Sequence, residues 1–381
     1  MERSEAARSR SLSTWFARLI ARPDIQDLAS RLPFGRGMAR RDGAEIFDIL
    51  QGFVASQVLV ALVELDILKR LLDGPQTAAN LALNRGIPTD RMERLLRAAV
   101  ALKLLRQRRN GFFALARRGA AILGVPGLPE MIQHNQAFYR DMADPVALLR
   151  GEEETNLQRF WPYVFGRAHE IEPDVAARYS DLMAQSQVLV AQDTLRMLSL
   201  KGVTRLLDVG GGSGMFLSHA LRQYPDLQAV LFDLPQVFPA AERFVARNGL
   251  SDRVTLSPGS FRMDALPGDA DAVSLIRVLY DHDDASVTAL IEKIFDYLPA
   301  GGRLIVSEPM AGSAAPDRAG DVYFALYTMA MGTGKARSAS EIAKICKAAG
   351  FVDVKIPRAP RLYITSALTC VKPVKKRSVK V

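Results

Sequence analysis

The sequence predicts an α/β chain in which a doubly wound, mostly parallel sheet follows a smaller and mainly helical domain. Two observations carry this prediction. From residue 206 to about residue 371, short apolar runs alternate with segments whose apolar residues recur at helical spacing, which is typical of a parallel sheet covered by helices on both faces. From residue 44 to about residue 123, the apolar residues recur mainly at helical spacing.

The composition is that of a two-domain globular protein. The chain has 381 residues, of which 49% are hydrophobic and 24% are charged, so it is long enough to bury a sizeable core. Its two cysteines, Cys346 and Cys370, lie in apolar surroundings and in no metal-ligand spacing, so neither a disulfide framework nor a metal site is expected. We recognise no secretory signal and no apolar run of bilayer-spanning length, and we expect a cytoplasmic location.

Residues 1–42 are predicted to form a basic amphipathic arm. Five apolar residues follow one helical stripe: Leu12, Trp15, Phe16, Leu19 and Ile20. Arginines flank the stripe, and a basic helix with Trp and Phe is typical of an anchor on a membrane surface. The same face could instead dock on the parent domain or on a partner subunit, and periodicity does not choose between these alternatives. The basic tail, residues 373–381, is interpreted as solvated.

A helical domain is predicted over residues 43–125. Three helical segments precede a hairpin centred on Asn110-Gly111, an order typical of winged-helix domains. That order also suits a DNA-binding regulator. However, the predicted helix over residues 91–105 alternates charged with core residues and lacks a cluster of side chains suited to reading bases, so nucleic-acid binding is not expected.

A strand, a glycine-rich turn and a helix are predicted at residues 206–217. The apolar run ends at Val209, and glycines follow at positions 210, 212 and 214. Such a turn lets the backbone approach a ligand, and the start of the helix presents free N–H groups to an anion. A dinucleotide fingerprint would need a glycine at position 215, where the chain has Met215.

An acid ends the next apolar run. Asp233 lies at the distance expected of a strand–helix–strand unit, where its carboxylate could accept both ribose hydroxyls of an adenosyl ligand. With Asp208 two residues before Gly210, the pattern is that of class I S-adenosylmethionine methyltransferases. The predicted cofactor site is therefore formed by Asp208, Gly210, Gly212, Gly214 and Asp233. S-adenosylhomocysteine is the expected product.

Further site candidates follow from the expected sheet. Strands are predicted at 254–257, 272–278, 303–307, 352–356 and 362–371. Ligands of an open α/β sheet bind beyond the carboxyl ends of its strands. The residues expected there, besides Asp208 and Asp233, are Ser260, Phe261, Tyr280 to Asp284, and Glu308.

The chain resembles a known family, the O-methyltransferases that include plant phenolic and bacterial polyketide enzymes. Within it, the chain is most similar to the branch of bacterial carotenoid synthesis. The motifs that carry the resemblance are Ser56-Gln57-Val58-Leu59, Asp144-Pro145-Val146-Ala147-Leu148-Leu149-Arg150, Leu182-Met183-Ala184-Gln185-Ser186-Gln187, Tyr280-Asp281-His282-Asp283-Asp284, Glu308-Pro309-Met310 and Met331-Gly332-Thr333-Gly334. The resemblance implies that the helical domain forms a homodimer interface.

The resemblance also implies roles around the cofactor. Asp233 would hold the ribose, Ser260 and Phe261 the adenine, and Arg277 the rim between the adenine and methionine regions. Met183, with Gln187 one helical turn later, would close over the sulfonium end. Ser260 departs from the aspartate common at its position, so the adenine contact is expected to be weaker or bridged by water.

The catalytic position departs from the family pattern as well. Relatives carry His-Asp after the fourth strand, where this chain has Tyr280-Asp281, and the nearby histidine is His282. An aliphatic alcohol is a far weaker acid than a phenol, whose pKa is near 10, so its proton should leave alongside methyl transfer. His282 is the best-matched base by chemistry, whereas Tyr280 is best placed by alignment and could orient the hydroxyl with Asp281 as relay.

Other interpretations of these residues stay open. Glu308 matches one of two flanking glutamates of the family and Ala336 replaces the second. Asp281 to Asp284 could simply cap the following helix, and Tyr280 could be core. His134, His169 and His219 are interpreted as structural. The predicted substrate pocket, whose members could equally be core, comprises Phe138, Met142, Trp161, Tyr323, Tyr327 and Met331.

The predicted function is methylation of the 1-hydroxyl of a hydroxycarotenoid of the spheroidene or spirilloxanthin type. The alternatives are O- or C-methylation of another hydrophobic substrate, such as a polyketide or bacteriochlorophyll precursor, or a winged-helix regulator with a vestigial cofactor domain. A bilayer-resident substrate would give the amphipathic arm a purpose at the photosynthetic membrane. The remaining predicted boundaries are residues 126–200 for a helical linker that contributes to the pocket and residues 201–372 for the methyltransferase domain.

Overall fold

The computed structural model describes residues 14–152, 154–160 and 173–374, apart from the side chains of Pro33, Phe34, Phe160 and residues 173–184. The chain divides into two compact units, Met1–Ala121 and Ile122–Val381.

The first unit is mainly helical. After a helical segment at residues 14–20, its elements are α2 (Pro23–Arg31), α3 (Pro33–Glu64), α4 (Ile67–Arg70), α5 (Ala78–Ala82), α6 (Thr89–Ala101), β1 (Leu105–Gln107) and β2 (Phe113–Leu115). The two strands pair antiparallel around Gly111, whose φ of +79° suits glycine. α7 (Arg117–Gly124) follows. The predicted order of helices and hairpin is therefore present.

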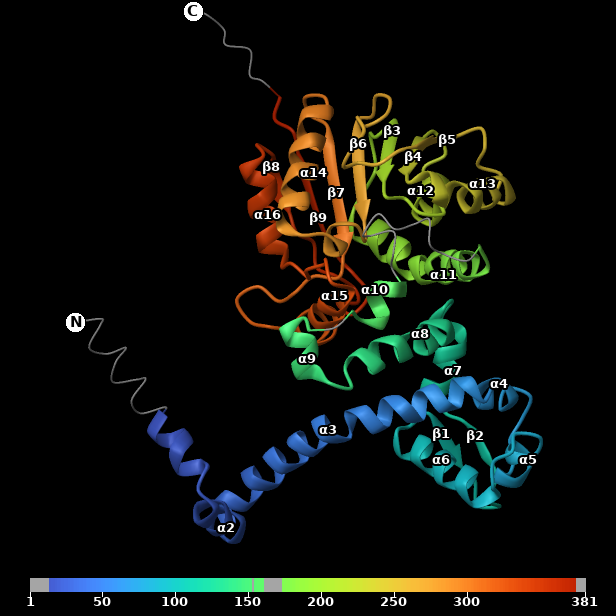
Figure 1. Cartoon of the computed structure of the whole chain (residues 1–381), viewed down its shortest axis with the longest axis vertical. Coiled ribbons are helices and arrows are strands. Elements are labelled where there is room, and N and C mark those ends of the chain that lie inside the picture. The colour runs from blue at the N-terminus through green and yellow to red at the C-terminus, as the bar shows by residue number, and fades with distance from the viewer. Residues whose placement is uncertain (1–13, 153, 161–172, 375–381) are drawn as a thin grey trace, which may run out of the picture. The chain divides into compact units, whose positions relative to one another are not determined.

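The long helix α3 begins earlier than the sequence suggested. It starts at Pro33 instead of near residue 44, because proline is well suited to the first turn of a helix, where its missing N–H is not needed. A row of apolar side chains along its middle is exposed: Ile46, Phe47, Ile49, Leu50, Phe53 and Val54. Figure 1 shows α3 extending from the rest of its unit. Exposed apolar rows are typical of surfaces that contact a partner.

The same helix bears on membrane spanning. Its stretch Gly35–Glu64 is long and apolar enough, by length and composition, to cross a bilayer, and only 17% of its most apolar window is buried. This corrects the expectation that no apolar run reaches that length. Core helices of soluble proteins reach the same length and hydropathy, so these two properties alone do not indicate a membrane span.

The second unit begins with four helices. They are α8 (Leu128–Asp141), α9 (Pro145–Arg150), α10 (Asn156–Phe160) and α11 (Pro173–Met197). α9 starts sharply because the Asp144 carboxylate accepts hydrogen bonds from the N–H groups of Val146 and Ala147. α8 and α11 thus lie before the sheet in the chain, and both contribute to the site described below.

A seven-stranded sheet organises the second unit. Its strands are β3 (Arg205–Val209), β4 (Gln228–Asp233), β5 (Val254–Pro258), β6 (Ala272–Ile276), β7 (Arg303–Glu308), β8 (Val352–Lys355) and β9 (Ser366–Val371). Their order is β5-β4-β3-β6-β7-β9-β8, parallel except that β9 pairs antiparallel with both β7 and β8. The strand order reverses at β3 and β6, which is where a doubly wound sheet binds its ligand.

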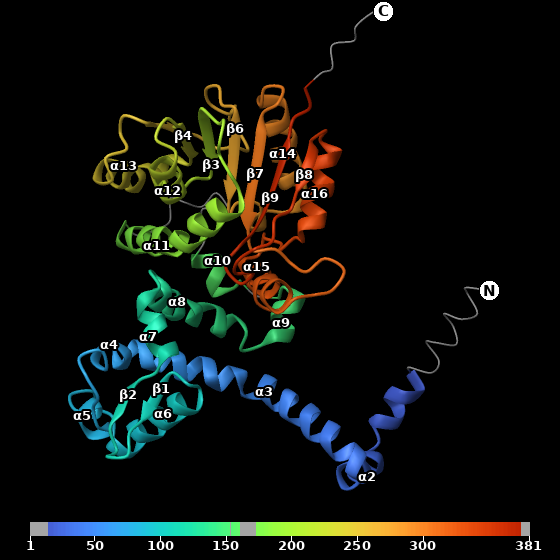
Figure 2. The same cartoon turned by 180° about the vertical axis from the view of Figure 1, so that it is seen from behind.

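Helices cover both faces of this sheet. α11, α12 (Met215–Gln223) and α13 (Phe238–Arg247) pack on one face, and α14 (Asp284–Tyr297) and α16 (Ala339–Ala348) pack on the other, as Figures 1 and 2 show from opposite sides. Successive residues of β3 serve the two layers, since Leu206 packs with α12 and Leu207 with α14. The predicted doubly wound α/β fold is confirmed.

Short elements complete the carboxyl edge of the sheet. They are η3 (Pro235–Val237), η4 (Leu279–Asp281), η5 (Arg318–Phe324) and α15 (Ala325–Met331). Two predicted strands differ in length. The strand expected at 272–278 ends at Ile276, because Arg277 has a φ of +58°, and the strand expected at 362–371 begins only at Ser366.

Candidate active site

The glycine turn after β3 forms a backbone cradle. Gly210, Gly212 and Gly214 have φ values of +69°, +58° and +87°, the left-handed region that favours glycine. A Cβ at Gly210 would lie 2.9 Å from Val278 Cγ2, whereas a Cβ at Gly212 would have no atom within 4 Å. Gly210 is therefore required by packing, and Gly212 keeps space open at the cradle.

Two aspartates flank this cradle. Asp233, at the end of β4, accepts hydrogen bonds from the backbone N–H groups of Gly212 at 2.8 Å and Leu234 at 2.7 Å. Each carboxylate oxygen keeps a second lone pair for a ligand hydroxyl. Asp208 is 1% exposed, accepts a 2.6 Å hydrogen bond from Ser274 Oγ through Oδ1, and has a pKa raised to about 7 by burial.

Unpartnered buried atoms gather at the predicted site. In the described part of the chain, six buried side-chain atoms lack a hydrogen-bond partner, and all except Arg205 Nε belong to predicted site residues: Gln187 Oε1, Asp208 Oδ2, Arg277 Nε, Asp281 Oδ1 and Glu308 Oε1. Native proteins leave few such atoms, so their clustering indicates missing ligand contacts. Four of the five are oxygens, three of them from acids, and they suit a ligand that carries an ammonium and a sulfonium. The residues therefore fit S-adenosylmethionine.

Ser260 and Phe261 follow β5 at the same edge. The backbone N–H of Ser260 donates to Asp264, and the Phe261 ring meets the His282 ring edge-on, with centroids 5.2 Å apart. His282 Nδ1 lies 2.9 Å from the Arg262 guanidinium. Burial, and then the charge of Arg262, lowers the pKa of His282 to about 4. The structure thus places His282 beside the residues predicted to hold adenine.

Arg277 holds Tyr280 in place. The left-handed backbone of Arg277 is unusual for a residue other than glycine, and such backbone concentrates at functional sites. Its guanidinium lies 5.5 Å from the centre of the Tyr280 ring, and Nη2 donates a 3.1 Å hydrogen bond to the Tyr280 hydroxyl. Burial raises the pKa of Tyr280, which keeps this hydroxyl protonated.

Two buried acids complete the predicted catalytic group. Glu308, at the end of β7 and 0% exposed, accepts the backbone N–H of Tyr280 at 3.2 Å. Burial raises the pKa of Glu308 to about 8 and that of Asp281 to about 7. The predicted Tyr280, Asp281 and Glu308 therefore come together, whereas the side chain of His282 turns towards Phe261.

The helix cap at this turn is formed by other aspartates. Asp283 accepts the backbone N–H of Ser286 and caps α14, and Asp284 binds Arg337. The alternative interpretation, that an aspartate of the run Asp281 to Asp284 caps the following helix, therefore applies to Asp283 and not to Asp281.

Sequence reasoning missed the role of Arg337. This side chain is fully buried and donates to Asp284 at 2.7 Å and to the carbonyl oxygens of Leu279 and His282, both at 2.9 Å. It therefore fixes the whole 279–282 turn. Its position after the Met-Gly-x-Gly run was the available signal, but no pattern in the sequence marks an arginine as buried.

Aromatic side chains from α8 and the η5–α15 segment form one cluster. Phe138, Tyr327 and Met331 are buried there, with Met142 and Tyr323 packed against them. Phe138 meets both tyrosine rings edge-on, and the two tyrosines stack with centroids 5.9 Å apart. The structure thus brings five predicted pocket residues together. Trp161 lies outside the described residues, as does the side chain of Met183 on α11.

A second feature missed by the sequence lies within this cluster. His134 is 8% exposed, and its Nε2 lies 2.8 Å from the Tyr327 hydroxyl. The neighbouring Tyr323 hydroxyl donates to Asn135 Oδ1 at 2.7 Å. These pairs join α8 to residues almost two hundred positions later, which no local sequence pattern reveals.

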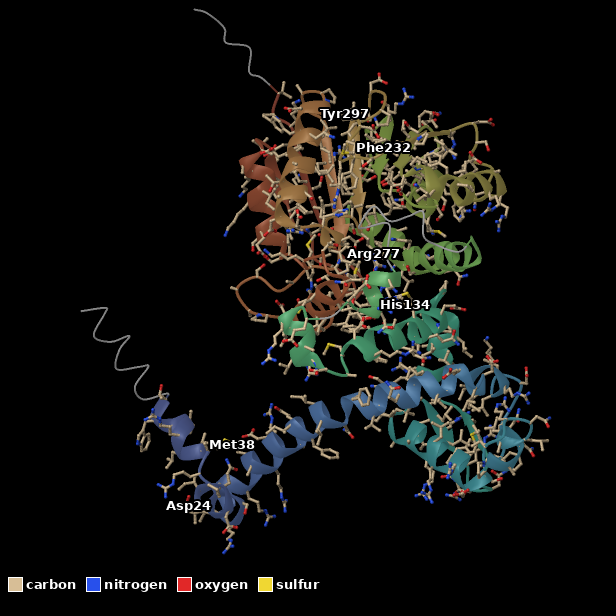
Figure 3. All side chains as sticks on the ribbon, in the orientation of Figure 1. Asp24, Met38, His134, Phe232, Arg277 and Tyr297 are labelled. Carbon is tan, nitrogen blue, oxygen red and sulfur yellow. The ribbon has the colours of Figure 1, made fainter. Side chains whose placement is uncertain are left out.

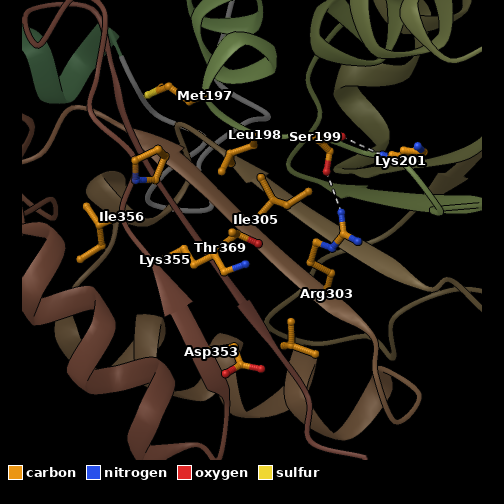
Figure 4. Close-up of a pocket in the computed structure, with 12 residues that line it drawn as sticks. Met197, Leu198, Ser199, Lys201, Arg303, Ile305, Asp353, Lys355, Ile356 and Thr369 are labelled. Carbon is orange, nitrogen blue, oxygen red and sulfur yellow. Dashed lines mark hydrogen bonds between the residues drawn. The ribbon is translucent and has the colours of Figure 1, made fainter.

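A cavity of about 580 Å³ lies elsewhere in the second unit. It is lined by the end of α11, the start of β7, the edge strand β8 and its neighbour β9, with Lys201, Arg303 and Lys355 among its walls (Figure 4). No predicted site residue lines it. Among the described residues, no group of three or more His, Cys, Asp or Glu could hold a metal ion.

Comparison with known proteins assigns the family. A family model described as the O-methyltransferase domain matches residues 139–352, and one described as the O-methyltransferase dimerisation domain matches residues 47–124. The chain belongs to the O-methyltransferase family. The predicted family and the predicted enzyme class, an S-adenosylmethionine-dependent O-methyltransferase, are confirmed, and with them the enzyme is favoured over the DNA-binding regulator.

Two relatives of this O-methyltransferase cover nearly its whole length. The chain is 52% identical to the demethylspheroidene O-methyltransferase of Cereibacter sphaeroides, over 95% of this chain and 96% of that protein. It is 48% identical to the demethylspheroidene O-methyltransferase of Rhodobacter capsulatus, over 93% and 88%. Among solved structures, human N-acetylserotonin methyltransferase in complex with SAM shares the fold, with a TM-score of 0.75 and 24% identity over 87% of this chain and 98% of that chain.

Proposed function

We propose that this O-methyltransferase transfers a methyl group from S-adenosylmethionine to the 1-hydroxyl of a hydroxycarotenoid. The observation that carries the proposal is the 52% identity, along nearly the full length of both chains, to a protein named demethylspheroidene O-methyltransferase. The site described above is compatible with this chemistry. Its carboxyl edge joins an adenosyl-type cradle to an apolar aromatic cluster, as a polar donor and a hydrophobic acceptor require.

The donor half of the site would be held by backbone and acids. Asp233 would bind the ribose hydroxyls, Ser260 and Phe261 the adenine, and Asp208, Gln187 and Met183 the methionine end. When bound, S-adenosylmethionine supplies a methyl group activated by its sulfonium charge. Burial raises the pKa values of Asp208, Asp281 and Glu308 in the free protein, and the positive charges of the donor would favour the ionised form of these carboxyls.

The acceptor half would position one hydroxyl. Phe138, Met142, Trp161, Tyr323, Tyr327 and Met331 would contact the apolar chain of the substrate. The turn with Tyr280 and Asp281, together with Glu308, would orient the hydroxyl against the methyl group, because in-line displacement depends mainly on positioning. Proton removal would accompany methyl transfer, since an aliphatic alcohol does not ionise beforehand near neutral pH.

The test uses purified protein, radiolabelled S-adenosylmethionine and a panel of hydroxycarotenoids, polyketides and bacteriochlorophyll precursors. We expect label in a hydroxycarotenoid as a methyl ether. Label confined to a polyketide or a bacteriochlorophyll precursor would favour the other hydrophobic substrates and contradict the proposal.

We propose further that the enzyme is a homodimer that rests on the photosynthetic membrane. The dimerisation domain supports the first part, and the exposed apolar row of α3 offers the surface. Support for the second part is the helical segment 14–20, where Trp15 and Phe16 are 62% and 54% exposed beside basic residues such as Arg18 and Arg22. A carotenoid dissolved in the bilayer would then reach the enzyme without entering water.

The membrane proposal is tested by flotation with anionic vesicles. The full chain should float with the vesicles, and a chain lacking residues 1–25 should not. Unchanged flotation of the shortened chain would remove the proposal. A shortened chain that stays off vesicles but becomes monomeric would assign the arm to the partner subunit instead.

A further inference from the structure

A buried polar pair stands inside the apolar aromatic cluster. His134 on α8 and Tyr327 on α15 are 8% and 5% exposed, and His134 Nε2 lies 2.8 Å from the Tyr327 hydroxyl. Their neighbours Phe138 and Met331 are apolar and buried. Replacing such a pair by apolar residues of the same shape is often neutral or stabilising, so packing alone does not explain it. The pair therefore suggests a chemical role.

The pair reaches the predicted catalytic turn through Arg277. The charge of Arg277 interacts with the hydroxyls of Tyr280 and Tyr327 and with Asp281. α15 also packs directly against this turn, since a Cβ at Gly334 would lie 2.4 Å from the carbonyl oxygen of Tyr280 and 3.0 Å from Thr328 Cβ. Figure 3 labels Arg277 at the end of β6 and His134 on α8. Arg277 thus bonds to Tyr280 on η4 and interacts through its charge with Tyr327 on α15.

Tyr280 and His282 are less suited to accept a proton. Burial raises the pKa of Tyr280, and its hydroxyl oxygen already accepts the hydrogen bond from Arg277. The ring of His282 packs on Phe261, and its Nδ1 lies 2.9 Å from Arg262, both on the segment that follows β5. His282 is thereby held at the predicted adenine end of the site.

We propose that Tyr327 and His134 together accept the proton of the substrate hydroxyl, an inference that rests on the proposed function. The substrate oxygen forms its bond to the methyl carbon while the carbon–sulfur bond breaks and its electron pair stays on sulfur. The hydroxyl proton passes to the Tyr327 oxygen, and the phenolic proton of Tyr327 passes to His134 Nε2. The products are the methyl ether, the neutral thioether and an imidazolium at His134. Tyr327 is then a catalytic residue, and His134 acts through it as a positioning residue.

The environment of His134 suits this step. Burial lowers its pKa to about 4, so the imidazole is neutral near pH 7 and ready to accept a proton. A weak acceptor suffices, because the hydroxyl proton becomes strongly acidic as the new carbon–oxygen bond forms. The nearby Arg277 charge would favour any negative charge that develops on the Tyr327 oxygen.

The test compares Tyr327→Phe and His134→Gln with two matched controls. Tyr297→Phe removes a hydroxyl that donates to Pro267 at the far end of α14, and His219→Gln changes a half-buried histidine of α12. With a hydroxycarotenoid substrate, we expect kcat to fall about 100-fold in each pair variant and to stay within about threefold in the controls. Affinity for S-adenosylmethionine, measured by calorimetry, should be unchanged in all four. The proposal would be overturned if both pair variants kept the kcat of the wild type. It would also be overturned if His282→Gln showed the loss of kcat that is expected for the pair variants and the pair variants did not.

Two readouts separate proton transfer from a structural role. A hydroxycarotenoid analogue with a more acidic, fluorinated alcohol should recover most of the kcat lost in His134→Gln, which a packing defect would not allow. In the free protein, nitrogen NMR should show His134 neutral at pH 7 and altered by Tyr327→Phe, but not by Tyr297→Phe. If the NMR signals showed a charged His134 at pH 7, or did not change in Tyr327→Phe, the proposed proton transfer through this pair would be wrong for any substrate. Failure of the wild-type protein to methylate any hydroxycarotenoid would instead count against the proposed function.

Discussion

The two halves of the site are built by different means. The donor half uses backbone geometry after β3, where Gly210, Gly212 and Gly214 adopt left-handed conformations within a few residues of each other. The acceptor half uses side chains gathered from distant segments, as the contact between His134 and Tyr327 shows. A backbone cradle serves one constant donor, whereas a collection of side chains can differ from one acceptor to another. The contrast explains how relatives with other substrates share this fold.

The largest expected effect concerns the support of the acceptor half. Arg337→Gln removes a fully buried guanidinium that holds Asp284 and two carbonyl oxygens of the 279–282 turn. We expect the free energy of unfolding to fall by about 3 kcal/mol in urea titrations. The matched control is Arg318→Gln, an exposed arginine at the start of η5, which should change it by less than about 0.5 kcal/mol. Equal stability of the two variants would contradict the supporting role.

Substitution of Asp233 is the most direct test of the donor half. Asp233→Ala removes the carboxylate proposed to bind two ribose hydroxyls, and we expect calorimetry to show about 100-fold weaker binding of S-adenosylmethionine. The control is Asp252→Asn, an exposed aspartate between α13 and β5. Circular dichroism should show that both variants remain folded. Undiminished affinity in Asp233→Ala would exclude the ribose role.

A pH series sharpens the electrostatic side of the comparison. Burial raises the pKa of Glu308 from 4.5 to about 8, so between these pH values the folded protein keeps a proton that the unfolded chain has lost. Stability without ligand should therefore fall as pH rises through this window, and the penalty is complete above pH 8. We expect Glu308→Gln to be more stable than the wild type by about 2 kcal/mol at pH 8 and nearly equal to it below pH 4.5.

The control for the pH series is Glu292→Gln, at an exposed position of α14. Its stability should follow the wild type across the same pH range. If Glu308→Gln also followed the wild type, Glu308 would be charged in the folded protein at the same pH as in the unfolded chain, and burial would not raise the pKa of this acid as described above.

The smallest expected effect concerns glycine substitutions, which separate backbone strain from loss of cofactor binding at the cradle. Gly212→Ala and Gly249→Ala both place a Cβ at positive φ, +58° and +66°, with no atom within 4 Å. Each should therefore lose about 1 kcal/mol of stability. Only Gly212→Ala should also weaken binding of S-adenosylmethionine, by about tenfold, because its Cβ fills the space kept open at the cradle. Equal affinity in the two variants would place the donor elsewhere.

The same contrast explains what the sequence could predict. The cradle and Asp233 were predicted from their spacing, because residues 206–217 form one contiguous strand, turn and helix and Asp233 ends the next strand. The sheet and its helices followed from apolar periodicity. The motif around Tyr280 also pointed to the end of a strand, and the structure places it in the turn that follows β6.

Other features had no local signal. His134 was interpreted as structural because no acid is paired with it in a motif, and its partner Tyr327 lies 193 positions later in the chain. The orientation of the His282 ring towards Phe261 depends on how two strand ends approach each other, which periodicity does not fix. The burial of Arg337 and the left-handed backbone of Arg277 run against the usual preferences of arginine, so no propensity argument predicts them.

The most direct measurement of the central claim follows the methyl group itself. Purified enzyme is incubated with S-adenosylmethionine carrying a trideuterated methyl group and with a 1-hydroxycarotenoid in vesicles, and the product is analysed by mass spectrometry and NMR. The account predicts an intact trideuterated methyl group on the 1-oxygen of the carotenoid. Recovery of the carotenoid without the label, under conditions where calorimetry shows the donor bound, would contradict it.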